Sequence, residues 1–286
     1  MNGAASDITA VIATVGEDSL SETIEKLLKG TVQPDLILVC IPKTYANRIT
    51  KINKRRGRVR VIETEFQGQV AQRAFGFAQV QTTFTLQIDS DTFVEERCLE
   101  HLLFEAKKHE HTVIAPTLHD AETGKALGYL TPESKMEVTT FQKMIYWIMN
   151  GDSGFKEGTI SKAGVGFGIK DPTIPTIVEW FPGCCALHRT ANLIIDNFYR
   201  FEGKAYCEDL FHSTLLRENS LQIYIADKAK VSINAPRISL QHLLIEEYMY
   251  IRATVSFVKW RQLSILRFFV FRLILLLSKA CNRLRF

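Results

Sequence analysis

Short apolar blocks alternate with helical stripes along the first third of the chain. The blocks at 8–13 and 36–41 are continuously apolar, as in strands buried on both faces of a parallel sheet, and 59–62 is a third predicted strand. Between the first two blocks, leucine and isoleucine recur at helical spacing from Leu20 to Leu28, and Gly30 ends the helix. The run Ser19-Leu-Ser-Glu22 predicts a capping box at its start.

A second helix is expected between the third strand and the block that begins at Phe84. Its predicted buried face holds Ala71, Ala74, Phe75 and Ala78. Strand and helix thus alternate four times, which is typical of a parallel sheet with crossover helices. The predicted fold class is α/β.

The stretch 84–91 ends in two carboxylates. Phe84, Leu86 and Ile88 alternate with polar residues, so this stretch reads as a strand, and Asp89 and Asp91 follow with only Ser90 between them. Thr92 and Glu95 predict the capped start of a helix that continues with Leu99, Leu102, Leu103 and Ala106. Two acids at the carboxyl end of a strand lie on the rim where open α/β sheets bind ligands.

Crowded carboxylates raise each other's pKa unless a cation or hydrogen-bond donors compensate. Mg²⁺ or Mn²⁺ held by one or two carboxylates completes its shell with water and substrate phosphates, so Asp91 and Asp89 are candidate metal ligands. A solvated turn is the alternative, because Asp is common in turns.

The alternation of predicted strands and helices ends after the apolar run 113–115. Residues 141–149 form an apolar helical piece, and six glycines follow between Gly151 and Gly168. Gly164-Val-Gly-Phe-Gly168 lacks the spacing and the early strand context of a dinucleotide loop. The glycine-rich segment is therefore interpreted as a lid or acceptor loop, or as an ordinary surface loop.

A second acidic pair follows later in the chain. Residues 177–181 and 186–188 read as strands around Pro182-Gly183, where glycine indicates a close backbone approach. Glu208 and Asp209 then begin a helix with Leu210, Leu215 and Leu216. The helix dipole alone would favour carboxylates there, but Asp209 is a competent general base if it faces Asp89 and Asp91.

Composition limits the class of protein. The 286 residues suffice for one large domain or two small ones, and the net charge of +4 is too mild to indicate a nucleic-acid partner. Six cysteines have no metal-type spacing and are expected to be reduced thiols in a cytosolic protein. Residues 1–7 lack the basic and apolar regions of a signal peptide.

These pieces, in this order, resemble the family 2 glycosyltransferases with the GT-A fold, over about Ile8 to Arg252. The closest resemblance is to bacterial enzymes that build O-antigen and capsule chains. Asp89-Ser90-Asp91 is similar to their DxD motif and Glu208-Asp209 to their ED motif. The segments similar to their acceptor-side and donor-side motifs are Val178–Arg189 and Gly68–Gly76.

The resemblance implies a GT-A domain at 1–252, with a nucleotide-binding half at about 1–115 and an acceptor-side half at about 116–252. It implies an inverting, Mg²⁺- or Mn²⁺-dependent transfer from a nucleotide-diphosphate sugar to a hydroxyl of a glycan or lipid-linked glycan acceptor. The implied site residues are Asp91 as direct metal ligand, Asp89 nearer the ribose or base, Asp209 as base beside Glu208, and Arg73, Thr14 and Glu17 toward the donor.

Two features depart from the family pattern. The second strand ends in Cys40-Ile-Pro-Lys43 where the family has an acid for base and ribose recognition. The late strand 229–234 lacks the histidine that often completes the metal shell, leaving Asn234, His212 and His242 as alternatives. Arg73 as an ordinary surface charge is also an open alternative.

The last residues, 253–286, are basic and apolar. From Lys259, a helical stripe of Arg261, Arg272, Lys279 and Arg283 opposes an apolar face. The apolar face holds Leu263, Leu266, Val270, Leu273, Leu277, Ala280 and Leu284. We expect 259–286 to lie on an anionic membrane surface, on the cytoplasmic side of a bacterial inner membrane. Phe268, Phe271 and Leu275 interrupt the polar face, so packing on protein is the alternative.

Two other functions are considered. One is a catalytically inactive, sugar-nucleotide-binding scaffold at the membrane. The other is a haloacid-dehalogenase-type phosphatase, whose D-x-D motif has Thr or Val two residues after the second Asp, where this chain has Phe93.

Overall fold

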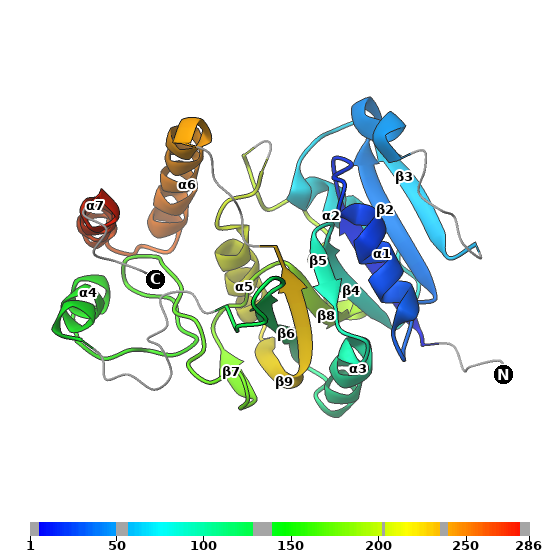
Figure 1. Ribbon diagram of the computed structural model, residues 1–286, viewed down its shortest axis with the longest axis horizontal. Coiled ribbons are helices and arrows are strands. Elements are labelled where there is room, and N and C mark those ends of the chain that lie inside the picture. The colour runs from blue at the N-terminus through cyan, green and yellow to red at the C-terminus, as the bar shows by residue number, and fades with distance from the viewer. Residues whose placement is uncertain (1–5, 50–56, 128–138, 202–203, 235–239, 281–286) are drawn as a thin grey trace.

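A computed structural model describes residues 6–49, 57–127, 139–201, 204–234 and 240–280. A nine-stranded sheet lies at the centre, with the strand order β3-β2-β1-β4-β8-β6-β9-β5 and β7 paired to β9. Figure 1 shows helices on the faces of this sheet and a separate group, α4, α6 and α7, on one side of it. The predicted α/β class is confirmed.

The first half of the sheet is parallel. It contains β1 (Ile8–Ala13), β2 (Leu36–Pro42), β3 (Val59–Thr64) and β4 (Phe84–Asp89), all near the predicted bounds. The connections are α1 (Leu20–Lys29), the short 3-10 helix η1 (Lys43–Ile49) and α2 (Gln69–Phe77). Ala13 pairs with Asp89, so the loop after β1 and the DxD segment lie side by side at the same rim.

The second half of the sheet is mixed. β8 (Cys185–Arg189) runs antiparallel to both β4 and β6 (Thr112–Asp120), and β6 runs parallel to β9 (Gln222–Ile233). The short strands β5 (Thr92–Val94) and β7 (Thr176–Val178) pair antiparallel with β9. The remaining elements here are α3 (Cys98–Lys108), α5 (Glu208–Glu218) and the 3-10 helix η3 (Thr190–Asn192).

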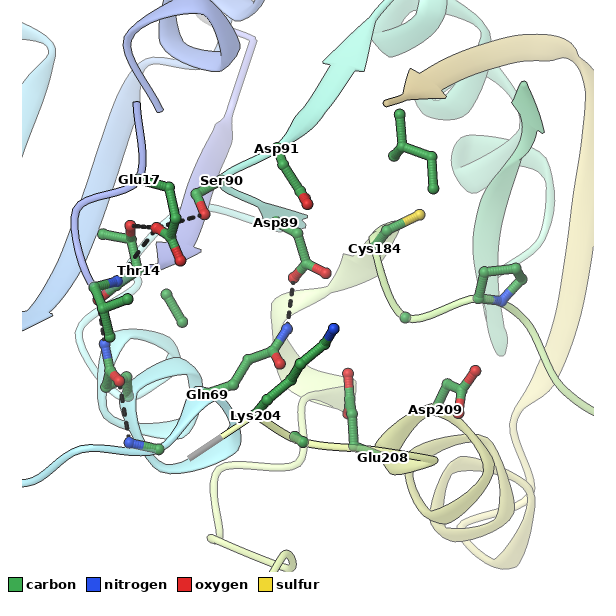
Figure 2. A pocket seen from close by; sticks show the side chains of 18 of the residues that line it. Thr14, Glu17, Gln69, Asp89, Ser90, Asp91, Cys184, Lys204, Glu208 and Asp209 are labelled. Carbon is green, nitrogen blue, oxygen red and sulfur yellow. Dashed lines mark hydrogen bonds between the residues drawn. The ribbon is translucent and has the colours of Figure 1, made fainter. Parts of the chain in front are cut away.

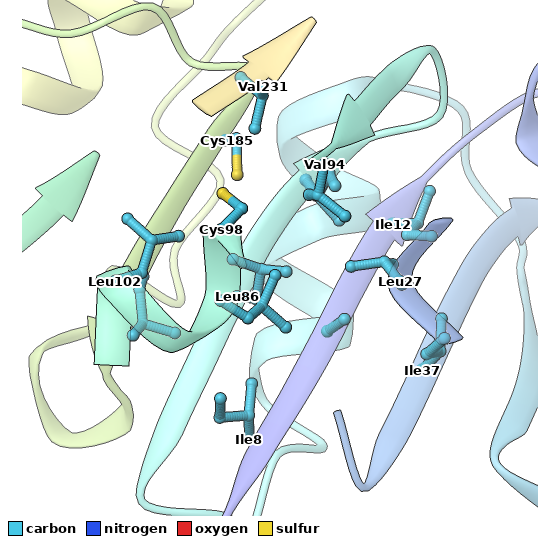
Figure 3. Close-up of a cluster of buried hydrophobic side chains, with 14 of the residues drawn as sticks. Ile8, Ile12, Leu27, Ile37, Leu86, Val94, Cys98, Leu102, Cys185 and Val231 are labelled. Atoms are coloured by element: carbon cyan, nitrogen blue, oxygen red, sulfur yellow. The ribbon is translucent and has the colours of Figure 1, made fainter. Parts of the chain in front are cut away.

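The main core lies between the sheet and helices α1 and α3. Figure 3 shows Ile12, Leu27 and Leu86 packed in this layer, with Cys98 and Leu102 of α3 beside them. Phe77 of α2 packs on the opposite face of the sheet, against Val11 and Leu38. Burial of these apolar surfaces is the main stabilising contribution to the fold. The five cysteines within the described ranges are all free thiols.

Three local predictions were wrong. Thr92 does not cap a helix, because residues 92–94 pair with 231–233 as a strand and α3 begins only at Cys98. Ser19 makes no side-chain capping bond at α1, so no capping box forms. The buried face of α2 holds Val70, Arg73, Ala74 and Phe77, whereas Phe75 is exposed.

The second half of the glycine-rich segment, from Gly158 onward, is largely interior. The segment follows α4 (Thr140–Asn150), which begins with a capping box at Thr139, and its residues Ala163, Val165 and Phe167 are fully buried. A Cβ atom on Gly166 would lie 2.2 Å from the Trp180 ring. This segment is therefore a packed part of the structure and not an ordinary surface loop.

The C-terminal residues form two helices, α6 (Leu240–Trp260) and α7 (Ile265–Ala280). The boundary expected near 252 falls inside α6, and the helix expected from Lys259 onward begins at Ile265. Phe268, Phe271 and Leu275 pack against α4, and Arg272 is buried and ion-paired with Glu247. Arg272 is thus not a free member of a basic stripe. Residues 281–286, with Arg283 and Leu284, lie outside the described residues. None of the described helices has the length and apolarity needed to cross a bilayer.

Candidate active site

A cleft of about 590 Å³ opens at the rim where β1 and β4 end. Its walls come from the loop after β1, the DxD segment, the start of α2, the Pro182–Cys184 turn and the start of α5. Figure 2 shows Asp89, Asp91, Glu208 and Asp209 facing this space, with Lys204 between the two acidic pairs. The cleft thus brings together most of the residues predicted to form the site.

Asp89 is held by two donors behind the cleft. Its Oδ1 accepts hydrogen bonds from Gln69 Nε2 at 3.0 Å and from the Arg73 guanidinium at 2.9 Å. Burial raises the pKa of Asp89, and Arg73 opposes that rise. The position of this carboxylate is therefore fixed by the protein itself.

Arg73 is a buried bridge between two acids. Its side chain is 3% exposed, and its guanidinium contacts Asp89 Oδ1 and Glu208 Oε1, each at 2.9 Å. The expectation that Arg73 faces the donor is not supported, since it does not line the cleft, and the surface-charge alternative is wrong. Charged hydrogen bonds of this kind stabilise the ions only when the partners stay in place.

Asp91 faces the cleft with little compensation. Burial and then the charge of Asp89 raise its pKa, while Lys204 lowers it. Lys204 is an exposed residue of the cleft wall, and its ammonium also lies 5.3 Å from the Tyr206 ring centroid. A partly buried carboxylate whose neighbours disfavour its charge is suited to binding a cation.

Thr14 and Glu17 line the opposite wall, as predicted. Glu17 Oε2 accepts hydrogen bonds from Thr14 Oγ1 and, at 3.0 Å, from Ser90 Oγ. This contact ties the loop after β1 to the DxD segment. A chain of side-chain bonds of this kind keeps both segments in one arrangement.

The side chain of Gln72 lies next to the ends of β1 and β2. Its Nε2 donates to the carbonyls of Thr14 and Cys40, each at 2.8 Å, and its Oε1 accepts from Gly68 N at 3.1 Å. The chain has no acid at this strand end, and the amide of Gln72 satisfies the backbone there instead. Sequence reasoning missed Gln69, Gln72 and Lys204: the two glutamines lie in the Gly68–Gly76 segment, but only Arg73 was singled out there, and Lys204 belongs to no recognised motif.

Asp209 begins α5 and reaches the cleft from the far side. Burial, followed by the charge of Glu208, raises the pKa of Asp209 to about 7. Glu208 is buried and bound to Arg73 through Oε1, and both Glu208 and Asp209 line the cleft. A carboxylate with a pKa near 7 suits general base catalysis at neutral pH.

Gly183 passes directly over Glu208. A Cβ atom at Gly183 would lie 2.5 Å from Glu208 Oε1, and the Gly183 carbonyl accepts a 2.6 Å bond from Gln87. The close backbone approach predicted at this glycine is therefore explained by the Glu208 carboxylate. The turn at Gly183 is thus held between the Glu208 carboxylate on one side and the Gln87 amide on the other.

A second, apolar cavity of about 340 Å³ adjoins the cleft at Asp209. Its walls include Phe167, Trp180, Leu127 and Ile225, and it shares Leu118, Pro182 and Asp209 with the main cleft. The glycine-rich segment contributes Gly158 and Gly168 to it. The carboxylate of Asp209 thus stands between a polar and an apolar compartment.

The proposed third metal ligands do not join this group. His212 is 1% exposed and stacks on Phe198, and its pKa lies well below the ordinary value because of burial. Asn234 is not among the residues of the cleft wall, and the side chain of His242 lies outside the described residues. No cluster of three metal-binding His, Cys, Asp or Glu side chains occurs within the described ranges.

A sheet of this kind, with a DxD segment and a buried acid at one rim, defines the GT-A class of glycosyltransferases. The chain belongs to glycosyl transferase family 2: the model of that family matches residues 9–160, more than half of the sequence. No significant match was found among curated proteins.

Solved structures with the same fold include GalNAc-T7 with UDP, GalNAc and Mn²⁺, with a TM-score of 0.55 and 14% identity over 80% of this chain and 43% of that chain. Another is S. aureus TarS 1–349, with a TM-score of 0.50 and 15% identity over 87% of this chain and 64% of that chain. The structure of TarS 1–349 in complex with UDP-GlcNAc has a TM-score of 0.52 and 18% identity over 87% of this chain and 65% of that chain. The chain thus spans between 43% and 65% of these solved chains, and the likeness shows the shared fold.

Proposed function

We propose that this protein is an inverting, metal-dependent glycosyltransferase that moves a sugar from a nucleotide-diphosphate donor to a hydroxyl of a glycan acceptor. The observation that carries the proposal is the placement of Asp91 and Asp209 in one cleft, with Lys204 between the two acidic pairs. Structures with this fold hold UDP with GalNAc and Mn²⁺, or UDP-GlcNAc, which supports a nucleotide-sugar donor.

The residues present fit a divalent metal. Asp91 is a raised-pKa carboxylate in the cleft, and the hydrogen bonds found for Asp89 all use Oδ1. Asp91, with Asp89 nearby, would hold Mg²⁺ or Mn²⁺, and the ion would neutralise charge on the diphosphate leaving group. Lys204 supplies further positive charge to the same phosphates.

The chain's own residues then position and deprotonate the acceptor. Asp209 accepts the proton of the acceptor hydroxyl, whose oxygen forms a bond to the anomeric carbon as the bond to the diphosphate oxygen breaks. Attack occurs on the face opposite the leaving group, so the configuration inverts. Glu208, fixed by Arg73, holds the start of α5 in place.

The apolar cavity beside Asp209 is the proposed acceptor side. Its walls of Phe167, Trp180, Leu127 and Ile225 favour an acceptor with an apolar group close to the reacting hydroxyl. A lipid-linked glycan acceptor in surface polysaccharide synthesis, at the cytoplasmic side of a bacterial inner membrane, has this chemistry.

The test is a donor screen in the presence and absence of Mn²⁺, with UDP-, GDP- and dTDP-sugars, that measures donor hydrolysis or transfer. Metal-dependent turnover with one donor is expected, and Asp91→Ala should abolish metal-dependent nucleotide binding in a titration. Asp196→Ala, at an exposed aspartate outside the cleft, is the matched control. Unchanged binding by Asp91→Ala would show that the metal site is misassigned.

The screen also separates the alternative functions. A scaffold would bind donor without turnover at any metal concentration. Phosphate release from a phosphomonoester would favour the phosphatase, which has no support from the family match.

A further inference from the structure

Helix α7 has two apolar faces. Its inner face, with Phe268, Phe271 and Leu275, packs against α4 and the buried segment that contains Val165 and Phe167. Its outer face carries six large apolar side chains that remain exposed, which we call the α7 stripe: Leu266, Phe269, Val270, Leu273, Leu276 and Leu277.

The α7 stripe is continuous. Its members follow one another at intervals of three, one, three, three and one residues, so they share one side of the helix. Leu266 is 74% exposed and Leu273 57% exposed. Single exposed leucines are ordinary, whereas a contiguous apolar stripe marks an interaction site.

The stripe is held in a fixed position. The Arg267 guanidinium donates to the carbonyls of Trp147 and Ile148, at 3.0 and 2.7 Å, at the end of α4. Arg272 is paired with Glu247 of α6. Both arginines of α7 are thus used in packing, and the helix presents the stripe without a charge inside it.

Helix α4, against which α7 packs, also carries exposed apolar side chains. Trp147 is 58% exposed and Met144 is also exposed, on the helix to which Arg267 is bound. Lys143 is exposed beside them. Figure 1 shows α4 and α7 at the edge of the molecule that is farthest from β3.

The charged residues of helices α4 and α7 themselves have one sign. The sequences of α4 and α7 contain no acidic residue, and residues 253–286 contain seven lysines and arginines with no aspartate or glutamate. An anionic surface complements this charge, whereas a second copy of the chain would bring like charges together.

We propose that the α7 stripe, with Met144 and Trp147, docks this protein on the surface of an anionic lipid bilayer. The six apolar side chains enter the acyl boundary while Lys143 of α4 and Lys259, ahead of α7, remain among the headgroups. The inference does not depend on the glycosyltransferase reaction, because the stripe shares no residue with the cleft.

Flotation of the full chain with vesicles tests the proposal. Wild type should float with phosphatidylglycerol/phosphatidylcholine vesicles, less with pure phosphatidylcholine, and less at high salt because screening weakens the attraction. The variant Leu266→Gln/Leu273→Gln/Leu277→Gln should bind the anionic vesicles at least about tenfold more weakly than wild type. It removes apolar contact with the acyl chains and keeps every charge.

Two variants make the result interpretable. Ile174→Gln/Ile177→Gln/Ile195→Gln removes three equally exposed apolar side chains elsewhere and should float like wild type. Leu266→Met/Leu273→Met/Leu277→Met keeps the stripe apolar and should also float. If the triple Gln variant fails to fold, Leu273→Gln alone should still show weakened flotation with an unchanged melting temperature.

Three outcomes would overturn the proposal. The first is a wild-type protein that does not float with anionic vesicles. The second is a wild-type dimer by light scattering that the triple Gln variant dissociates, which would assign the stripe to a second copy. The third is equal loss of flotation in the Ile control variant, which would show that the stripe has no specific role.

Discussion

The Arg73 guanidinium lies 2.9 Å from Oε1 of Glu208, a residue 135 positions later in the chain. The same guanidinium contacts Asp89 at 2.9 Å, so a single buried cation connects the DxD segment to the start of α5. Arg73 therefore sets the distance between the two acidic pairs.

Replacement of Arg73 by Met should destabilise the fold. Asp89 and Glu208 would be left as buried carboxylates without their cation, and breaking a buried pair in this way costs about 3–5 kcal/mol. Urea denaturation measures the loss. Arg97→Gln, which removes an exposed pair with Glu100, should leave the midpoint nearly unchanged. Adding Glu208→Gln to Arg73→Met should recover part of the loss, and strict additivity of the two changes would contradict the bridge.

The variant Asp209→Asn should retain donor binding and lose transfer. A general base acts on the acceptor proton, and its removal costs ~10²–10⁴-fold in rate. Nucleotide titration and steady-state kinetics with one donor measure the two effects separately. Full turnover by Asp209→Asn together with loss by Glu208→Gln would move the role to Glu208.

The activity should depend on the ionisation of Asp209. Its pKa is about 7, so kcat/KM should rise as the pH approaches that value and level off above it, because only the carboxylate accepts a proton. Glu208→Gln removes a negative charge that raises this pKa, so the acid limb should move to lower pH. A limb that stays in place would exclude Asp209 as the titrating group.

The raised pKa of Asp209 also predicts how the stability of the fold depends on pH. The folded-state pKa of Asp209 lies above the unfolded value near 3.8, so folded protein binds the proton more tightly. The contribution of Asp209 is fully present below about pH 4 and is lost as pH rises through about 7. Asp209→Asn should flatten this part of a stability–pH curve measured by denaturation at several pH values, and an unchanged slope would contradict it.

The variant Gly183→Ala should disturb the ion pair between Arg73 and Glu208. The added methyl group would lie 2.5 Å from Glu208 Oε1, so either the turn or the carboxylate must move. Such overpacking costs about 1–3 kcal/mol, and transfer should fall with stability. Gly154→Ala is the control, since its nearest neighbour would be a side-chain atom 3.5 Å away. Equal melting temperatures for the two variants would contradict the close approach.

The strands and the acidic rim were predictable from sequence because their signals are local. Runs such as 36–41 and the position of Asp89 after an alternating strand need no knowledge of distant residues. Thr92 was misassigned because its strand partner, Ile233, lies far along the chain. Propensity allowed either a cap or a strand there, and tertiary pairing decided it.

The site was predictable only in part, for the same reason. Motif resemblance placed Asp91, Asp209, Thr14 and Glu17 near the cleft, and all four line it. It assigned Arg73 to the donor because no local pattern reveals two carboxylate partners. On α7, periodicity identified the apolar face now seen to be exposed, and Phe268 and Phe271 indicated packing on protein, but the sequence could not show that α4 covers them.

The insertion of β8 between β4 and β6 has a consequence for protein engineering. β8 pairs with both neighbours, and the backbone carbonyl of Cys184 accepts a 2.8 Å hydrogen bond from Asp89 N. A fragment that ends near residue 115 would expose the unpaired edge of β4, which is a template for aggregation. A chimera that exchanges other parts of the chain must therefore keep residues 181–189 together with β4, so that this edge stays paired.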